Sequence, residues 1–201
     1  MLGTTKIYGC LADPIDHVKA PTIFTSIFKE KNIDAVMVPI HVDKDNLENV
    51  ITSLKKIKNF EGMTVTIPHK QTVANLCDHL EQDAEFTQSV NWVKFDKNRK
   101  LTGNNFDGQG FVNGFLSQKF FTKNKKICIF GAGGAAVSIA CSLAKQKIKS
   151  LQIINRNFDK ANELMNKIKL IDKNLFVEAI EYKNNYLLND CDIIINATSL
   201  G

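Results

Sequence analysis

The stretch "KICIFGAGGAA", residues 126–136, joins an apolar strand pattern to a glycine-rich turn and the start of a helical pattern. Its G-x-G-x-x-G/A spacing keeps the turn tight, leaves room for a pyrophosphate and lets helix and strand pack closely. The free N–H groups and positive dipole at the helix start then face the anion. We therefore predict a dinucleotide-binding βαβ unit, the alternative being a glycine-rich turn that binds nothing. The residues expected around the cofactor phosphates are Gly131, Ala132, Gly133, Gly134, Ala135 and Ala136.

The end of the next strand, "LQIINRN", indicates which dinucleotide is bound. An Asp or Glu there would hydrogen-bond the adenosine ribose and favour NAD. The chain instead has Asn155, Arg156 and Asn157, with Lys160 one turn later, and arginine otherwise occurs only at Arg99. A planar, permanently charged guanidinium suits a 2′-phosphate, so these residues predict NADP. The alternative is a solvated arginine at a strand end.

Strand-length apolar runs alternate with amphipathic helical patterns along all 201 residues, which is typical of an α/β protein with largely parallel sheets. From residue 125 onward the pattern is regular and predicts a βαβαβ unit plus one more strand. The change in regularity near residues 108–124 indicates a domain boundary, and we divide the chain into residues 1–108 and 109–201. In the first part we expect strands over residues 6–11, 34–42, 62–67 and 89–95, and helices over 22–32 and 44–57.

Composition restricts the class of partner. The net charge of +5 comes from lysines spread along the chain, which suits an anionic small molecule, and no nucleic-acid recognition motif is present. The five cysteines are odd in number and lie far apart, so we expect reduced thiols, and the four histidines lack metal-ligand spacing. No signal peptide or membrane-spanning run is apparent. We therefore expect a cytoplasmic protein without a metal, a nucleic-acid partner or a membrane partner.

Two further stretches each carry one candidate charged group. In "TVTIPHK" a strand ends before Pro68, a residue suited to the start of a helix, so Lys70 projects from a fixed junction. In "GNNFDGQGF" a single carboxylate, Asp107, lies between an aromatic residue and two glycines. Taken alone, Lys70 is an exposed lysine and Asp107 an acid that caps its own turn.

Seven motifs together resemble the shikimate dehydrogenase family, which includes the quinate/shikimate dehydrogenases and their paralogues. They are "ADPIDHVKAP", "MTVTIPHK", "SVNWV", "GNNFDGQGF", "GAGGAA", "NRN" and "NATSLG", in the family's order and approximate spacing over essentially the whole chain. The resemblance implies an N-terminal α/β substrate-binding domain followed by a Rossmann-type doubly wound parallel sheet domain that binds NADP. Family members continue beyond the last motif, whereas this chain ends at Gly201, so we expect a truncated form or part of a longer protein.

The resemblance also implies an activity. Family members interconvert a ring hydroxyl and a ketone by hydride transfer in aromatic amino acid biosynthesis, and a lysine and an aspartate meet at the reacting oxygen. Those two residues match Lys70 and Asp107, which makes them a catalytic pair: the lysine protonates the alkoxide, and the carboxylate keeps the lysine charged. The resemblance assigns Asn91 and Thr66 to the substrate hydroxyls, and Thr198 and Ser199 to the nicotinamide end of the cofactor.

This sequence departs from the family pattern at the predicted substrate pocket. Two serines that hold the substrate carboxylate in the family are replaced by Val18 and Ala20, although Lys19 could still supply charge. Further substitutions place Thr64, Trp92 and Phe106 where the family has an asparagine and two threonines. Together they indicate a less polar or differently shaped pocket.

Three functions follow. The first is a shikimate dehydrogenase that reduces 3-dehydroshikimate with NADPH. The second is a paralogous NADP-dependent dehydrogenase for quinate or another hydroxylated ring acid, which Val18, Ala20 and Phe106 favour. The third is a catalytically idle nucleotide-binding regulatory module, which the presence of both Lys70 and Asp107 disfavours. The expected partner is a small ring carboxylate, and a homodimer is left open.

Overall fold

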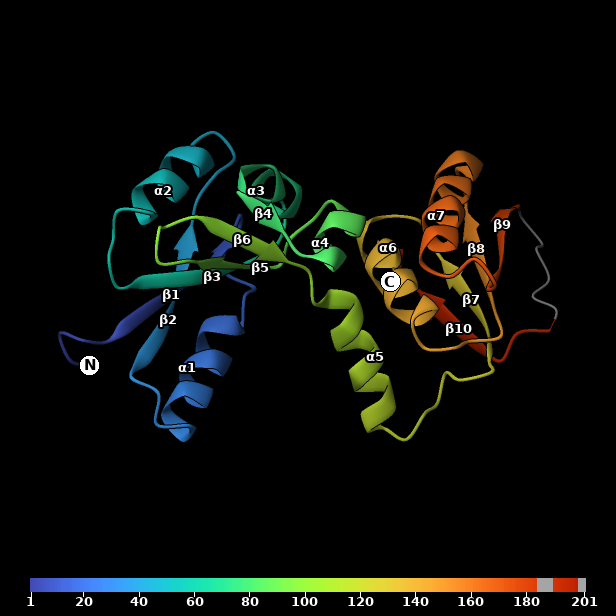
Figure 1. Ribbon diagram of the computed structural model, residues 1–201, viewed down its shortest axis with the longest axis horizontal. Helices are drawn as coiled ribbons and strands as arrows, with labels where there is room; N and C mark the ends of the chain where they lie inside the picture. Colours follow the sequence, from blue (N-terminus) through green and yellow to red (C-terminus); the bar gives the residue numbers. More distant parts are fainter. Residues whose placement is uncertain (184–189, 199–201) are drawn as a thin grey trace. The chain divides into compact units, whose positions relative to one another are not determined.

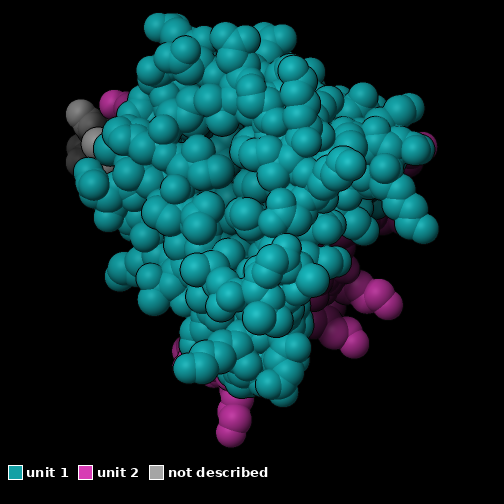
Figure 2. Space-filling view, turned by 90° about the vertical axis from the view of Figure 1, so that its left-hand side faces the viewer, with its two compact units in different colours: residues 1–105 teal, residues 106–201 magenta. Residues whose placement is uncertain are grey.

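The computed structural model describes residues 1–183 and 190–198 of the chain. These residues form two compact units, residues 1–105 (unit 1) and 106–201 (unit 2), shown as ribbons in Figure 1 and in two colours in Figure 2. The predicted division after residue 108 lies just inside the first helix of unit 2, α5 (Asp107–Ser117).

Unit 1 is built on a six-stranded sheet with the order β2-β1-β3-β5-β6-β4. Its strands are β1 (Lys6–Ala12), β2 (Ala35–His41), β3 (Phe60–Val65), β4 (His79–Leu80), β5 (Trp92–Phe95) and β6 (Leu101–Asn104). The sheet is parallel across β2, β1 and β3, but β5 is antiparallel to both β3 and β6. A tight turn joins β5 to β6, where the Asp96 N–H donates to the Lys100 carbonyl at 3.0 Å, and it makes this pair antiparallel.

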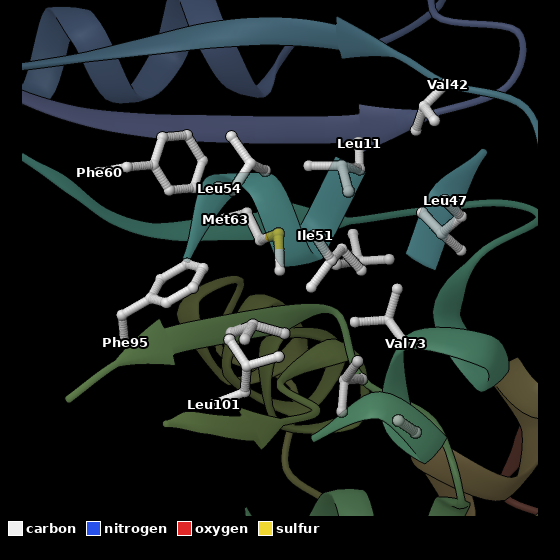
Figure 3. Packing of buried hydrophobic residues seen from close by; sticks show 14 of the residues in the cluster. Leu11, Val42, Leu47, Ile51, Leu54, Phe60, Met63, Val73, Phe95 and Leu101 are labelled. Carbon is white, nitrogen blue, oxygen red and sulfur yellow. The ribbon is translucent and has the colours of Figure 1, made fainter. Parts of the chain in front are cut away.

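Helices cover both faces of this sheet. Helix α1 (Ala20–Glu30) lies on one face, and α2 (Leu47–Leu54) and α3 (Lys70–Leu76) lie on the other (Figure 1). The fourth helix, α4 (Gln82–Thr87), precedes β5. The core of unit 1 lies beneath α2, where apolar side chains recur at helical spacing and meet the apolar residues of the strands. The residues in contact there include Leu47, Ile51 and Leu54 of α2 and Leu11, Phe60 and Met63 of the sheet (Figure 3).

Arg99 has a structural role at the end of α2. Its guanidinium donates to the backbone carbonyls of Leu54, Lys55, Ile57 and Phe60 at 2.8–3.2 Å. It also lies 4.5 Å from the centre of the Phe95 ring. The last carbonyls of a helix have no intrahelical donor, and Arg99 donates to one of them, Leu54, and to three carbonyls of the segment from α2 to β3. These contacts give Arg99, the one arginine of unit 1, a role in stabilising the fold.

Unit 2 has a four-stranded parallel sheet with the order β10-β7-β8-β9. Its strands are β7 (Lys126–Phe130), β8 (Ser150–Asn155), β9 (Phe176–Glu181) and β10 (Ile193–Asn196). Helix α6 (Gly134–Ala144) joins β7 to β8, and α7 (Phe158–Ile171) joins β8 to β9. This arrangement confirms the predicted βαβαβ unit with one additional strand. Helix α5 packs against α6.

Candidate active site

In the sheet of each unit, the chain first adds strands on one side of its first strand and later places a strand on the other side. The point between these two directions is the switch point of the sheet. In unit 1 the chain goes from β1 to β2 on one side and then crosses to β3 on the other, so the carboxyl ends of β1 and β3 border this point. In unit 2 the corresponding point lies between β7 and β10. Open α/β sheets bind ligands outside the carboxyl ends of their strands at such switch points. Most of the predicted site residues follow these strands.

The glycine turn after β7 has the geometry that the sequence predicts. Gly131 has φ +108°, and a Cβ there would lie 2.8 Å from the Ala197 carbonyl oxygen, so both the backbone angle and the close approach require glycine. At Gly133 and Gly134 an added Cβ would meet nothing within 4 Å, which leaves open space beside the turn. Ala136 is fully buried where helix and strand pack. Gly133 is the N-cap residue of α6 and has no side chain that could bond the first N–H groups of the helix.

A hollow of about 860 Å³ surrounds this turn. It is lined by Phe130, Gly131, Ala132, Gly133, Gly134, Ala135, Ile154, Asn155, Arg156, Asn157, Lys160, Tyr182, Asn196, Ala197 and Thr198. Among these described lining residues there are two cations and no carboxylate. The structure therefore brings the predicted phosphate turn and the predicted 2′-phosphate residues to one cavity whose charge suits a dinucleotide phosphate.

Five of these lining residues were not predicted from the sequence: Phe130, Ile154, Tyr182, Asn196 and Ala197. They come from the ends of four strands, and only the sheet order brings them together. Tyr182 follows β9, and its ring meets that of Phe130 edge to face with centroids 6.2 Å apart. In the sequence, the aromatic residue directly after the third strand of the βαβαβ unit was the feature that could have indicated Tyr182 as a lining residue.

The loop after β8 is held in place by its own side chains. The Asn155 amide donates to the Asn157 carbonyl at 2.8 Å, and Asn157 Oδ1 accepts from the Lys160 backbone N–H at 3.0 Å. The second bond caps α7 at its N-terminus. Arg156, between the two asparagines, is exposed, as is Lys160. The loop backbone is therefore fixed, while the two cationic side chains remain accessible to an anion.

Thr198 lies beyond the end of β10. Its backbone N–H and its hydroxyl both donate to Asn196 Oδ1, at 3.1 and 2.8 Å. These bonds form a small turn at the same edge of the sheet as Gly131. Ser199, predicted beside it, lies outside the described residues.

In unit 1, Lys70 is the first residue of α3, and its junction with β3 is tied to neighbouring strands. The Thr66 N–H donates to the Leu11 carbonyl at 3.0 Å, and the Asp13 N–H donates to the Ile67 carbonyl at 3.2 Å. The Lys70 carbonyl accepts from the Val90 N–H at 3.1 Å. The backbone that carries Lys70 is therefore bonded to the segments after β1 and before β5.

His69, which was not singled out from the sequence, is fully buried directly before Lys70. Its Nε2 lies 2.7 Å from the Val42 carbonyl oxygen, at the end of β2. Since a carbonyl oxygen can only accept, Nε2 is the donor. His69 Nδ1 is buried without a hydrogen-bond partner among the described residues. The imidazole hydrogen bond thus also connects the Lys70 junction to the residue that follows β2.

The remaining predicted substrate residues of unit 1 lie in the loop after β1, at the start of α1, on β3 and directly before β5. Val18 and Ala20 are half-buried, in the loop after β1 and at the first residue of α1. Thr64 lies on β3, and its hydroxyl is 3.5 Å from the Gly9 carbonyl oxygen. The backbone of Asn91 bonds to both neighbours, accepting from the Val65 N–H at 2.9 Å and donating to the Asn104 carbonyl at 3.0 Å. These residues come from the ends of three adjacent strands.

Trp92 has a packing role in the structure. Its ring stacks with Tyr8 at 6.0 Å and with Phe24 of α1 at 6.2 Å between centroids. The contact between α1 and the sheet therefore explains the tryptophan. Its presence no longer argues for a changed substrate pocket.

Asp107 and Phe106 belong to unit 2. Asp107 is the first residue of α5, where the helix dipole favours a negative charge. The Phe106 carbonyl accepts from the Gly110 N–H at 2.8 Å, and the Phe106 side chain is 49% exposed. The helix begins directly at the predicted catalytic carboxylate.

Other classes of site find no support among the residues that the structure describes. No group of three His, Cys, Asp or Glu side chains there could hold a metal ion. All five cysteines are free; burial raises the pKa of Cys77 to about 11 and that of Cys128 to about 12. Those two thiols stay protonated near neutral pH and are poor nucleophiles. None of the helices described is long and apolar enough to cross a bilayer.

Comparison with known proteins gives consistent matches to both units. Residues 10–93 match the family described as "Shikimate dehydrogenase substrate binding domain", and residues 115–200 match "Shikimate / quinate 5-dehydrogenase". The shikimate dehydrogenase (NADP(+)) of Methanosphaera stadtmanae is 37% identical over 202 residues, covering 99% of this chain and 70% of that protein.

Solved structures also match the chain over nearly its whole length. A shikimate dehydrogenase in complex with NADP+ is similar with a TM-score of 0.85 and 32% identity, over 98% of this chain and 68% of that one. The 5-ketofructose reductase of Gluconobacter sp. strain CHM43 is similar with a TM-score of 0.85 and 28% identity, over 98% and 70%. The arrangement of strands and helices is thus shared with enzymes named for more than one substrate.

Proposed function

This chain belongs to the shikimate dehydrogenase family, and we propose that it reduces 3-dehydroshikimate, or a related ring keto acid, to the hydroxy acid with NADPH. One observation supports the proposal: in each unit, several of the predicted site residues follow strands that border the switch point of the sheet. In unit 1 these are residues matching the family's substrate motifs, and in unit 2 they are a dinucleotide turn in a cationic hollow.

The side chains supply the proton chemistry of this reaction. Bound NADPH supplies the hydride, which reduces the carbonyl carbon and leaves a negative charge on its oxygen. We assign Lys70 as the group that hydrogen-bonds that oxygen and gives it a proton as the charge develops. Asp107 is assigned as the carboxylate partner that favours the charged form of the lysine. One hydride and one proton together convert the ketone to the alcohol.

The side chains of unit 2 fit the phosphates of NADP. The turn leaves open space at Gly133, where a pyrophosphate needs to approach the backbone. Arg156 and Lys160 provide two cations on the loop that follows the second strand, where the 2′-phosphate of NADP is bound in such folds. We propose that these residues select NADP over NAD.

Arg156→Ala is expected to raise KM for NADP by about 10- to 150-fold, because a hydrogen bond to a charged group contributes about 1.5 to 3 kcal/mol. KM for NAD should change little, since NAD has no 2′-phosphate to bind. Initial-rate measurements with each cofactor give both constants. Lys173→Ala removes an exposed cation of unit 2 that does not line the hollow and serves as the control. Equal losses for NADP and NAD would show that Arg156 does not read the 2′-phosphate.

A second candidate is a dehydrogenase for quinate or another hydroxylated ring acid. Val18 and Ala20 lack the hydroxyl groups that hold the substrate carboxylate in the family, and Phe106 presents a half-exposed ring beside Asp107. These three residues favour a substrate pocket that differs from that of ordinary family members.

Steady-state kinetics of the full-length protein test the proposal. Shikimate, quinate and other hydroxylated ring acids are each assayed as reductants of NADP and of NAD, with nicotinamide absorbance as the readout. We expect NADP-dependent oxidation of at least one ring acid. A protein that binds NADPH but oxidises none of the acids would support the idle nucleotide-binding module instead.

A further inference from the structure

Helices α5 and α6 approach each other closely at Gly108 and Ser138. Gly108, the second residue of α5, is buried, and its N–H donates to Ser138 Oγ of α6 at 2.8 Å. A Cβ added at Gly108 would lie 1.9 Å from the Ser138 carbonyl oxygen and 2.5 Å from Ser142 Oγ. Any side chain at residue 108 would therefore force the two helices apart.

This contact lies between two parts of the proposed site within unit 2. Gly108 directly follows Asp107, and Ser138 lies one turn into the helix whose first residue, Gly134, lines the cofactor hollow. The N–H groups of a first helical turn have no intrahelical acceptor, so Gly108 needs an external one if it is buried. Ser138 provides that acceptor, and Ser142, one turn further along α6, places a second buried hydroxyl near the same glycine.

We propose that Gly108 and Ser138 are positioning residues that hold Asp107 at a fixed place relative to the cofactor turn. The inference rests on the proposed function, because it assumes that Asp107 acts during hydride transfer. A displacement of about 1 Å in a reacting group can cost about a hundredfold in rate. The close approach of the two helices keeps the carboxylate and the dinucleotide turn in one rigid arrangement inside unit 2.

Gly108→Ala tests the close approach. The added methyl group should push α5 away from α6, and kcat should fall by at least about tenfold. The Kd for NADPH, measured by titration of its fluorescence, should change by less than about threefold, because the cofactor turn belongs to α6. Gly110→Ala is the matched control: it is the same substitution on the same helix, at a position where an added Cβ meets nothing within 4 Å. This control should retain the wild-type kcat.

Ser138→Ala tests the hydrogen bond and still decides the question if Gly108→Ala does not fold in a thermal unfolding measurement. It should lower kcat by about three- to tenfold with unchanged NADPH affinity, because it leaves the buried Gly108 N–H without its acceptor. Ser117→Ala, which removes an exposed hydroxyl at the end of α5 that bonds only the Gly114 carbonyl of its own helix among the described contacts, should retain the wild-type kcat.

Several outcomes overturn the inference. A folded Gly108→Ala variant with wild-type kcat would do so, and so would equal kcat values for Ser138→Ala and Ser117→Ala. A parallel loss of NADPH affinity and kcat would also do so, since it would indicate a general structural role. A wild-type protein that binds NADPH but shows no dehydrogenase activity would instead refute the proposed function, and the positioning role would fall with it.

Discussion

Lys70→Ala is expected to lower kcat by about a hundredfold or more, with a much smaller change in substrate KM. The expectation follows from the role assigned to Lys70, because a proton donor acts mainly in the transition state. Stopped-flow or steady-state measurement of NADPH oxidation gives kcat directly. Asp107→Asn should also lower kcat, because it removes the charge proposed to keep the lysine protonated.

Lys70→Arg separates proton transfer from simple charge stabilisation. Arginine keeps the positive charge but does not release a proton in proteins, so a true proton donor is not replaced by it. We expect Lys70→Arg to be nearly as impaired as Lys70→Ala. Lys56→Ala, an exposed lysine of unit 1 outside the proposed site, should have the wild-type kcat. If Lys70→Ala kept near-normal turnover, the proposed mechanism would be wrong.

The nucleotide-binding half could be predicted from the sequence because its chemistry is local. Gly131 and Gly133 have requirements that depend on the backbone of one turn, and the alternating pattern after residue 125 predicts the strands on either side. The rest of the hollow could not be found this way. Tyr182 and Ile154 reach it because the sheet order places β8 beside β7 and β9 beside β8, and a local sequence pattern does not specify the sheet order.

Contacts between elements were likewise missed. Ser138 stands in "AAVSIACSLA", where a small polar residue among apolar ones gives no sign of what it touches. His69 lies between a proline and the candidate lysine, and this local sequence does not indicate that its side chain is buried. In the structure its imidazole is buried against the Val42 carbonyl, a residue 27 positions earlier in the chain. Both assignments need tertiary contacts, which propensity and periodicity do not supply.

The substitutions in the loop after β1 predict a weaker affinity for shikimate. Val18 and Ala20 lie in that loop and at the start of α1. A carboxylate held there by two hydroxyls in other family members would lose both hydrogen bonds. Each hydrogen bond to a charged group contributes about 1.5 to 3 kcal/mol. Shikimate should therefore bind about two to four powers of ten more weakly than to a site with both serines, unless Lys19 replaces the contacts.

The double substitution Val18→Ser with Ala20→Ser should then raise kcat/KM for shikimate, while the Kd for NADP stays unchanged because the cofactor hollow lies in unit 2. The matched control is Ile23→Ser with Ile27→Ser, which makes two similar apolar-to-hydroxyl changes at exposed positions further along α1. The control should leave kcat/KM unchanged. A wild-type protein already as efficient on shikimate as ordinary family members, and not improved by the two serines, would rule out a divergent pocket and favour 3-dehydroshikimate as the substrate.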